Sequence, residues 1–295
     1  MKPITKTFIL LLTATTVSGN HHAMDNNDET ISLPLRQDVK EPYYVIDFSA
    51  VSCKFEIQIN KASVFSMNVD GQVGTEIPCN FMIFESGRQQ LDIIVYPSTG
   101  NTEFAESTDF SAKVKLYDVV DKFELVEDDI LVWKMSDDDK TGAICRHTAF
   151  FNADVPYRLN TWQQSADLNA VENLREKVET AYQKLGEMIT KKQYDAFKNC
   201  MQEREKRMAV SMYLDQKSSK ERMDELIKNF KEGFEWIPLS GDETMHIYAD
   251  GKLVCLKTKD DESALQFRNK KTDDEIEVEI MFHLKEGDTE LSVSP

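Results

Sequence analysis

The sequence predicts an α+β protein of two domains: an N-terminal antiparallel β-sandwich, then a domain in which helices pack on an antiparallel sheet. The length of 295 residues suits about two domains. Apolar and polar residues alternate through 41–158, which is typical of half-buried strands. From about Ser165 the apolar spacing changes to every third or fourth residue, which is typical of helices. Strand-like segments return near the C-terminus, so helices precede a second sheet.

The composition allows a packed core and narrows the possible partners. Hydrophobic residues make up 41% of the chain and charged residues 29%, which argues against global disorder. Thirty-five Lys plus Arg stand against 52 Asp plus Glu, a formal net charge of -17. Because such a surface repels phosphate backbones, we expect no nucleic-acid partner. No apolar run approaches the ~20 residues that cross a bilayer, so we do not expect an integral membrane protein.

The first element, residues 1–19, has the pattern of a signal peptide. Lys2 and Lys6 give it a positive start, residues 8–12 are continuously apolar, and residues 17–19 are small or modest in size, as a signal peptidase requires. The apolar stretch is too short for a membrane anchor. The pattern therefore predicts a periplasmic or secreted protein.

Residues 20–40 are polar and acidic without periodicity, and we expect a flexible leader there. The β-sandwich is expected over 41–158, where short strand-like segments are separated by turn residues. Asp70-Gly71 is a turn pair that predicts the end of a strand. Exposed aromatic residues of this region could bind a carbohydrate, and the candidates are Tyr43, Tyr44 and Trp133.

One stretch of this domain is similar to uncharacterised secreted bacterial proteins. The resemblance depends on the pattern Ile77-Pro78-Cys79-Asn80, on Ser86-Gly87-Arg88-Gln89-Gln90, and on the strand 91–96 that ends at Pro97. It covers about forty residues. The resemblance implies a place in a bacterial envelope and implies no chemical activity.

Three apolar stripes predict three helices after about residue 165. The spacings of Asn169 with Glu172 and of Ser218 with Glu221 are those of capping boxes, and Gly233 can close the third helix. Each stripe needs a partner surface, because an isolated amphipathic helix is marginal in water. The stripes consist of Val171, Leu174, Val178, Tyr182, Leu185 and Ile189; of Tyr194, Phe197, Met201, Met208 and Met212; and of Met223, Leu226, Ile227 and Phe230.

The last part of the chain predicts the sheet on which these helices pack, within a domain over 165–295. Residues 244–249 and 252–258 flank Asp250-Gly251, which predicts a hairpin. Two further strands are expected near 265–267 and 276–282. This order of elements resembles the NTF2-like and cystatin-like α+β cone, which implies helices on a curved sheet and a pocket between them.

Such a pocket would hold a small apolar ligand. Adaptable methionine and aromatic side chains suit an apolar ligand, although the same side chains could simply fill the core. The candidate pocket residues are Tyr182, Phe197, Met201, Trp236 and Tyr248. No sequence motif assigns a catalytic role to any of them, and no cofactor is predicted.

The chain has five cysteines, an odd number, and no CxxC motif. Cys53 and Cys79 fall in strand-like segments of one region and are the candidate disulfide; buried unpaired thiols are the alternative. We expect no metal site. His246 and His283 could approach each other across the C-terminal sheet, but nothing in the sequence fixes such a geometry.

The two sheet-forming regions are strongly acidic, and this charge favours a binding function. Region 41–160 has 10 basic and 20 acidic residues, a net of -10, and region 233–295 has 7 and 15, a net of -8. With no catalytic motif, the leading interpretation is an exported, non-catalytic binding protein whose partner is a protein or a small apolar ligand. The alternatives are a hydrolase or isomerase with a C-terminal pocket, and a carbohydrate-binding sandwich. A binding protein should show an apolar patch rimmed with acids, and an enzyme a His or carboxyl group of perturbed pKa.

Overall fold

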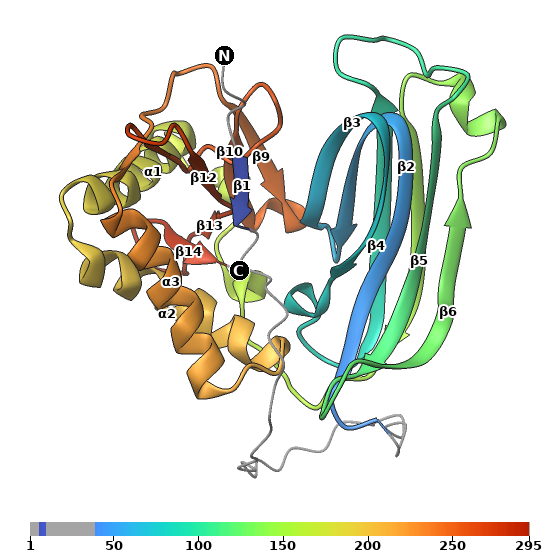
Figure 1. Ribbon diagram of the computed structural model, residues 1–295, viewed down its shortest axis with the longest axis horizontal. Coiled ribbons are helices and arrows are strands. Elements are labelled where there is room, and N and C mark those ends of the chain that lie inside the picture. The colour runs from blue at the N-terminus through green and yellow to red at the C-terminus, as the bar shows by residue number, and fades with distance from the viewer. Residues whose placement is uncertain (1–5, 10–38, 295) are drawn as a thin grey trace. The chain divides into compact units, whose positions relative to one another are not determined.

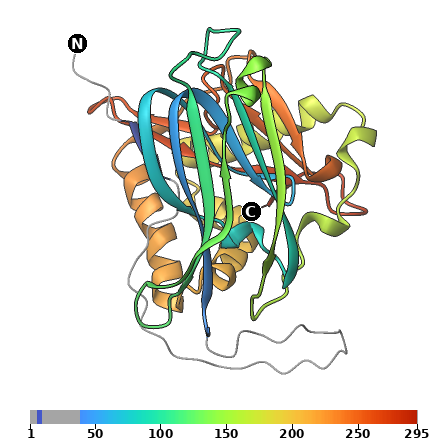
Figure 2. The same ribbon diagram turned by 90° about the vertical axis from the view of Figure 1, so that its right-hand side faces the viewer.

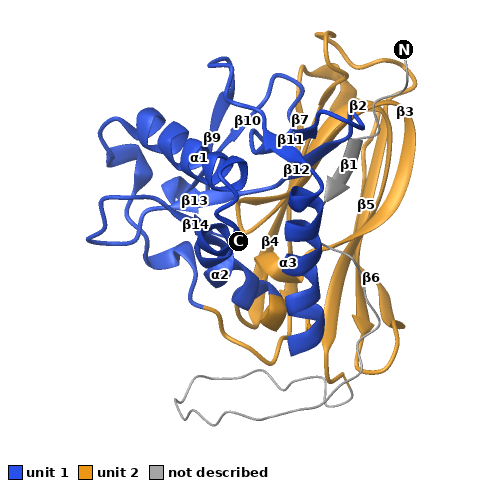
Figure 3. Cartoon of the chain, turned by 60° about the vertical axis from the view of Figure 1, so that its left-hand side comes forward, with its two compact units in different colours: residues 1–14, 160–208, 216–295 blue, residues 15–159, 209–215 orange. Residues whose placement is uncertain are grey.

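The computed structural model describes residues 6–9, by their backbone alone, and residues 39–294. The chain divides into two compact units (Figure 3): unit 1 contains 160–208 and 216–294, and unit 2 contains 39–159 and 209–215. The strand at 6–9 is grouped with unit 1. The predicted α+β class is confirmed: the described residues form three helices and sheets that are antiparallel except for one strand pair. Within the described residues, no helix combines the length and the apolar character needed to cross a membrane.

Unit 2 is built on one curled, six-stranded antiparallel sheet (Figures 1 and 2). The order is β6-β5-β2-β4-β7, and β3 pairs with β2 outside this path. The two packed sheets of the predicted sandwich are therefore not confirmed. The strands are β2 (Pro42–Ile59), β3 (Ala62–Pro78), β4 (Gly87–Pro97), β5 (Asp109–Asp118), β6 (Glu124–Lys134) and β7 (Cys145–Ala153).

Strand β2 is long and pairs with three other strands. It pairs with β3 along most of its length, with β5 through its first half and with β4 through its second half. The β2–β3 register shifts at Ser52, whose φ is 46°, and Asp70-Gly71 lies opposite this point. The predicted turn at Asp70-Gly71 is wrong, because Asp70 and Gly71 together oppose the single residue Ser52 and form a bulge with one extra residue inside β3. The β2–β3 turn is at Asn60-Lys61, both in the left-handed region.

Aromatic rings fill the inside of this sheet. The Phe55 ring centroid lies 4.9 Å from those of both Phe48 and Phe110, and all three side chains are buried. Trp133 on β6 stacks on His147 of β7 with centroids 4.6 Å apart. Because β6 and β7 are the two end strands of the sheet order, this contact shows that the sheet curls until its ends touch.

The helices of unit 1 are α1 (Leu174–Thr190), α2 (Tyr194–Ser211, whose last residues belong to unit 2) and α3 (Gln216–Lys231). The predicted caps are partly wrong. Asn173, in the left-handed region, is the N-cap of α1, because residues 168–170 form a separate 3-10 turn. Helix α3 begins before Ser218. Gly233, with φ of 110°, follows α3 as predicted, and its N–H donates to the Phe230 carbonyl at 3.3 Å.

Unit 1 has two four-stranded sheets, of order β1-β12-β11-β8 and β14-β13-β10-β9. The hairpin around Asp250-Gly251 is confirmed, since β9 and β10 pair antiparallel on either side of it. Strand β1 lies within the predicted signal peptide and pairs parallel to β12. The strands are β1 (Lys6–Ile9), β8 (Phe234–Trp236), β9 (Thr244–Tyr248), β10 (Leu253–Lys257), β11 (Gln266–Asn269), β12 (Glu275–Val278), β13 (Met281–His283) and β14 (Ser292–Ser294).

Candidate functional site

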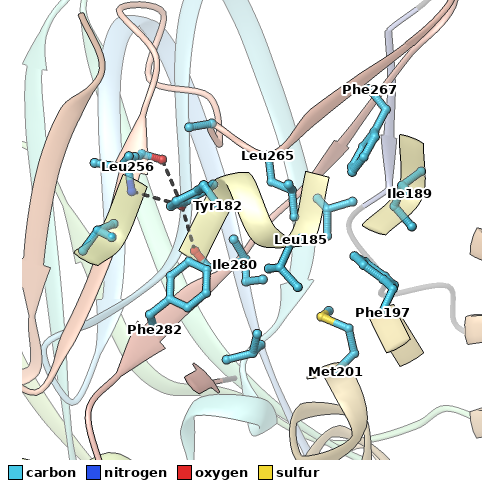
Figure 4. Packing of buried hydrophobic residues seen from close by; sticks show 14 of the residues in the cluster. Tyr182, Leu185, Ile189, Phe197, Met201, Leu256, Leu265, Phe267, Ile280 and Phe282 are labelled. Carbon is cyan, nitrogen blue, oxygen red and sulfur yellow. Dashed lines mark hydrogen bonds between the residues drawn. The ribbon is translucent and has the colours of Figure 1, made fainter. Parts of the chain in front are cut away.

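Most of the predicted pocket residues lie in the hydrophobic core of unit 1 (Figure 4). Tyr182, Phe197 and Met201 are fully buried there, and Trp236 packs against the cluster. The Tyr182 hydroxyl accepts from the Leu256 N–H at 3.0 Å, so the polar atom of this ring is satisfied inside the core. The structure thus places these side chains in core packing.

Tyr248 lies apart from that cluster. It ends strand β9 and is buried, with its ring centroid 6.1 Å from that of His246. The order of the sheet also separates the two histidines that the sequence suggested as neighbours: His246 is on β9 and His283 on β13, with β10 between them. No group of metal-binding side chains occurs among the residues that the structure describes.

The predicted disulfide does not form, since Cys53 and Cys79 are both buried free thiols. Cys53 pairs in register with Val69, whereas Cys79 follows the far end of β3 and its Sγ donates to the Tyr44 carbonyl at 3.4 Å. About nine residues of strand separate these places, roughly 30 Å at 3.3 Å per residue, far beyond the reach of an S–S bond. Burial raises the pKa of the Cys53 thiol to about 11.

Two polar side chains meet in the interior of unit 1. Ser165 follows a 3-10 turn, and its Oγ lies 2.7 Å from Nδ1 of His283 on β13, with both residues buried. The Ser165 carbonyl accepts from Lys252 Nζ at 2.6 Å, which fixes this part of the chain. Nε2 of His283 has no hydrogen-bond partner in the described structure.

Charged groups of α2 and of the segment after β13 act on this imidazole. Burial, aided by the cations Arg207 and Lys285 and opposed by Glu203, lowers the pKa of His283 to about 4. Lys285 Nζ and a Glu203 carboxylate oxygen form an ion pair at 2.9 Å. The imidazole is therefore neutral at neutral pH.

The Ser165–His283 pair has only part of the geometry of a nucleophilic site. A Ser–His–acid triad needs a third group that orients the ring through its other nitrogen. Here the other nitrogen is Nε2, which has no partner among the described residues. Since both side chains are also buried, the arrangement is that of an interior hydrogen bond.

An apolar patch with acidic neighbours lies on the β5–β6 hairpin of unit 2. Phe123, Leu125 and Val126 are 51%, 49% and 41% exposed, and we call these three residues the hairpin patch. The Phe123 ring packs edge-on against Tyr43 at 5.3 Å, so it is held in place. Farther along the same strand, Val132 is 63% exposed.

Acidic residues surround the hairpin patch in the sequence. Asp121, Glu124 and Glu127 flank or separate its members, and Asp121 and Glu124 are exposed. The neighbouring cation Lys122 lies 3.5 Å from Glu124, so three acids stand against one base around the patch. The patch is therefore apolar at its centre and negative at its rim.

The same hairpin carries a charged network on its polar face. Lys115 Nζ lies 2.7 Å from both Asp47 and Glu76 and 3.4 Å from Asp128. Lys113 binds Asp128 at 2.6 Å. Lys113 and Lys115 are therefore paired with carboxylates of the same sheet. Because three carboxylates surround the Lys115 ammonium, the net charge of this face is negative.

The aromatic residues suggested for sugar binding are differently placed. Tyr43 and Tyr44 are buried. Trp133 is half-buried, and His147 stacks on its ring with an interplanar angle of 10°. Two of the three rings therefore offer no face to a carbohydrate.

Comparisons with protein-family models, curated proteins and solved structures gave no match. The geometry alone therefore identifies the candidate sites, and the sequence did not single out either of them. The sequence suggests His283 only as a strand histidine that could approach His246, and nothing in it marks Ser165 as its neighbour. The sequence does contain a signal for the hairpin patch. Leu125-Val126 and the run 130–133 are consecutive apolar residues among acids, and one buried face of a strand cannot hold all of them.

Proposed function

We propose that this protein is an exported, non-catalytic binding protein that holds a protein partner at the hairpin patch. The observation that carries the proposal is the exposure of Phe123, Leu125 and Val126 together on one hairpin among acidic residues. Exposed apolar patches rimmed by polar groups mark interaction sites. A buried aromatic or aliphatic anchor surrounded by a polar rim is also the usual anatomy of a protein interface.

The charge of the rim supports a basic partner surface with an apolar anchor. The acids of region 41–160 exceed its bases by ten, and Lys113 and Lys115 are bound internally. A field of this sign accelerates encounter with a cationic protein and is screened by salt. Association should therefore slow several-fold as ionic strength rises from about 0.05 to 0.5 M.

The test compares two substitutions of equal chemistry at different places. Leu125→Lys adds a charge inside the hairpin patch, and Ile144→Lys adds one at a residue of similar exposure outside it. Partners are cross-linked on native cell-envelope material, identified, purified and titrated against each variant. We expect Leu125→Lys to weaken binding of the recovered partner at least tenfold, as for an interface anchor, and Ile144→Lys to leave it unchanged. Equal affinity of the two variants would rule out the patch.

Export to a periplasmic or extracellular space is part of the proposal and is supported by the signal-peptide pattern of residues 1–19. N-terminal sequencing of protein from its native cells tests it directly. A mature chain that begins at Asn20 supports export, and a chain that begins at Met1 excludes processing at this place. The likeness of unit 1 to the NTF2-like cone is likewise a proposal, supported by its helices-then-strands order.

A hydrolase is the second candidate, and the 2.7 Å contact between Ser165 Oγ and His283 Nδ1 is the observation that favours it. A fluorophosphonate probe, which reacts with activated serines, separates the candidates. Mass spectrometry would find the label on Ser165 if the pair is catalytic. Because both residues are buried, we expect no label under conditions in which the protein stays folded.

A further inference from the structure

We propose that the outer edge of β12 is a strand-acceptor site, which this chain's own segment Lys6–Ile9 fills and which removal of the N-terminus opens. That the edge becomes open rests on the proposed export, whereas the existence of the acceptor edge does not depend on it. Strand β1 pairs parallel to β12, with Lys6 opposite Glu275 and Ile9 opposite Val278 (Figure 1). Every other strand pair in the described structure is antiparallel.

The backbone of β12 shows which groups face this edge. The Val278 N–H donates to the Leu265 carbonyl at 3.0 Å, toward β11. Because successive residues of a strand direct their N–H and C=O groups to opposite edges, those of Ile276 also face β11. The N–H and C=O groups of Glu275 and Glu277 therefore face the outer edge. Without β1, this row would be an open template for another strand.

The site lies at the border of the unit 1 core. Ile276 and Val278 are buried in the hydrophobic cluster, so a strand beside β12 continues a sheet that already covers the core. Only four register pairs hold β1, and so short a strand contributes few hydrogen bonds. We therefore expect its segment to exchange with another of similar chemistry.

The chemistry of the occupant follows from the sequence of both strands. Residues 273–279 contain five acids, and Arg268 binds Glu275 from β11. The segment Lys6-Thr7-Phe8-Ile9 combines one lysine with apolar residues. A partner for the opened edge should accordingly present an extended segment in which apolar residues accompany a Lys or Arg.

Cleavage after Gly19 would remove β1 together with the predicted signal peptide. The exported chain would then expose the β12 edge, and an extended segment of a partner would occupy it by strand addition. This surface belongs to unit 1 and is separate from the hairpin patch of unit 2.

The experiment uses the full chain, made by cell-free synthesis so that residues 1–19 stay attached. Thr7→Pro with Ile9→Pro removes backbone donors from β1, and Thr7→Val with Ile9→Val is the matched control. Amide hydrogen exchange is measured by NMR. We expect the proline variant to exchange about tenfold faster at Glu275 and Glu277 and to be unchanged at Ile276 and Val278, which bond to β11.

A synthetic peptide of residues 2–10 is then added to the proline variant, with a scrambled peptide as control. Restored protection at Glu275 and Glu277 by the native peptide alone supports the acceptor site. Equal exchange in the proline and valine variants would show that β1 does not hold this edge, and absence of protection by the peptide would show that the edge accepts no strand. Leu125→Lys should leave all of these results unchanged, so failure here and failure of the hairpin patch are distinguishable.

Discussion

Acidification should destabilise unit 1 before most carboxylates titrate, because His283 is buried as a neutral imidazole. The perturbation is a decrease in pH from about 7 to about 5. The structural causes are the buried position of the ring and the cations Arg207 and Lys285 nearby. In the unfolded chain the same histidine has its ordinary pKa of about 6.5.

The sign and size of the effect follow from linkage. The pKa of His283 is about 4 in the folded protein. Between this value and about 6.5 the unfolded chain binds the proton more tightly, so the free energy of unfolding falls as the pH falls. A shift of about two and a half units corresponds to about 3 kcal/mol in total. About 2 kcal/mol of it should be lost between pH 7 and pH 5.

The assay compares wild type with His283→Gln, which keeps a polar side chain and cannot titrate. Urea unfolding is followed by tryptophan fluorescence, to which Trp162 and Trp236 of unit 1 contribute, at several pH values from 7 to 5. The difference in pH slope between the two proteins isolates the histidine, because all other groups are shared. Ser165→Ala supplies a second variant, which loses about 1 kcal/mol by removing the hydrogen bond and retains the pH slope.

A direct NMR titration of the His283 ring gives the same quantity in the folded state. If the ring titrates near its ordinary value, or if wild type and His283→Gln lose equal stability from pH 7 to 5, the argument from burial is wrong. The result does not depend on the absolute stability of the variant, since only the change with pH is compared.

Three further predictions concern single positions. Gly186→Ala should cost about 2 kcal/mol in urea unfolding, although alanine favours helices, because the added Cβ would overlap the Trp236 indole ring; Trp236→Leu should relieve the cost. Cys53 and Cys79 should both react with a thiol reagent only after unfolding, and intact mass should show no disulfide. Lys115→Met should lower the stability of unit 2 by about 1–2 kcal/mol, since it leaves Asp47, Glu76 and Asp128 without their shared cation. Added salt should recover part of the loss. An unchanged urea midpoint would show that the network is energetically neutral.

The class of the fold could be predicted from the sequence because hydrophobic periodicity follows burial directly. The apolar stripe of Val178, Tyr182 and Leu185 is the buried face of α1. The Asp250-Gly251 pair forms the turn between β9 and β10. In both cases the signal lies within a few neighbouring residues. The local rule and the tertiary structure agree there, so the prediction holds.

Features that depend on distant partners could not be predicted in this way. Asp70-Gly71 has the composition of a hairpin turn, but β2 continues alongside β3 and makes the pair a bulge. Cys53 and Cys79 occur in neighbouring segments, yet antiparallel pairing places Cys53 opposite Val69 in the middle of β3 and Cys79 beyond the end of that strand. Sequence spacing carries no information about such registers until the pairing itself is known.

The candidate sites show the same limit. Ser165 and His283 meet only because the chain returns to β13 after more than a hundred residues. The pocket predicted from methionine and aromatic residues used a signal that core packing shares, so periodicity could not separate the two roles. The hairpin patch could have been identified, because consecutive apolar residues among acids in a strand cannot all lie on its buried face.

The length of β2 has a consequence for how the molecule is made. Pro42 pairs with Asp118, so the earliest strand of unit 2 must wait for much later residues to leave the ribosome before its ladder is complete. Folds dominated by such distant contacts assemble slowly and expose unpaired strands meanwhile. If the chain is exported as proposed, it would pass through the translocation channel unfolded, and this sheet would form only afterwards.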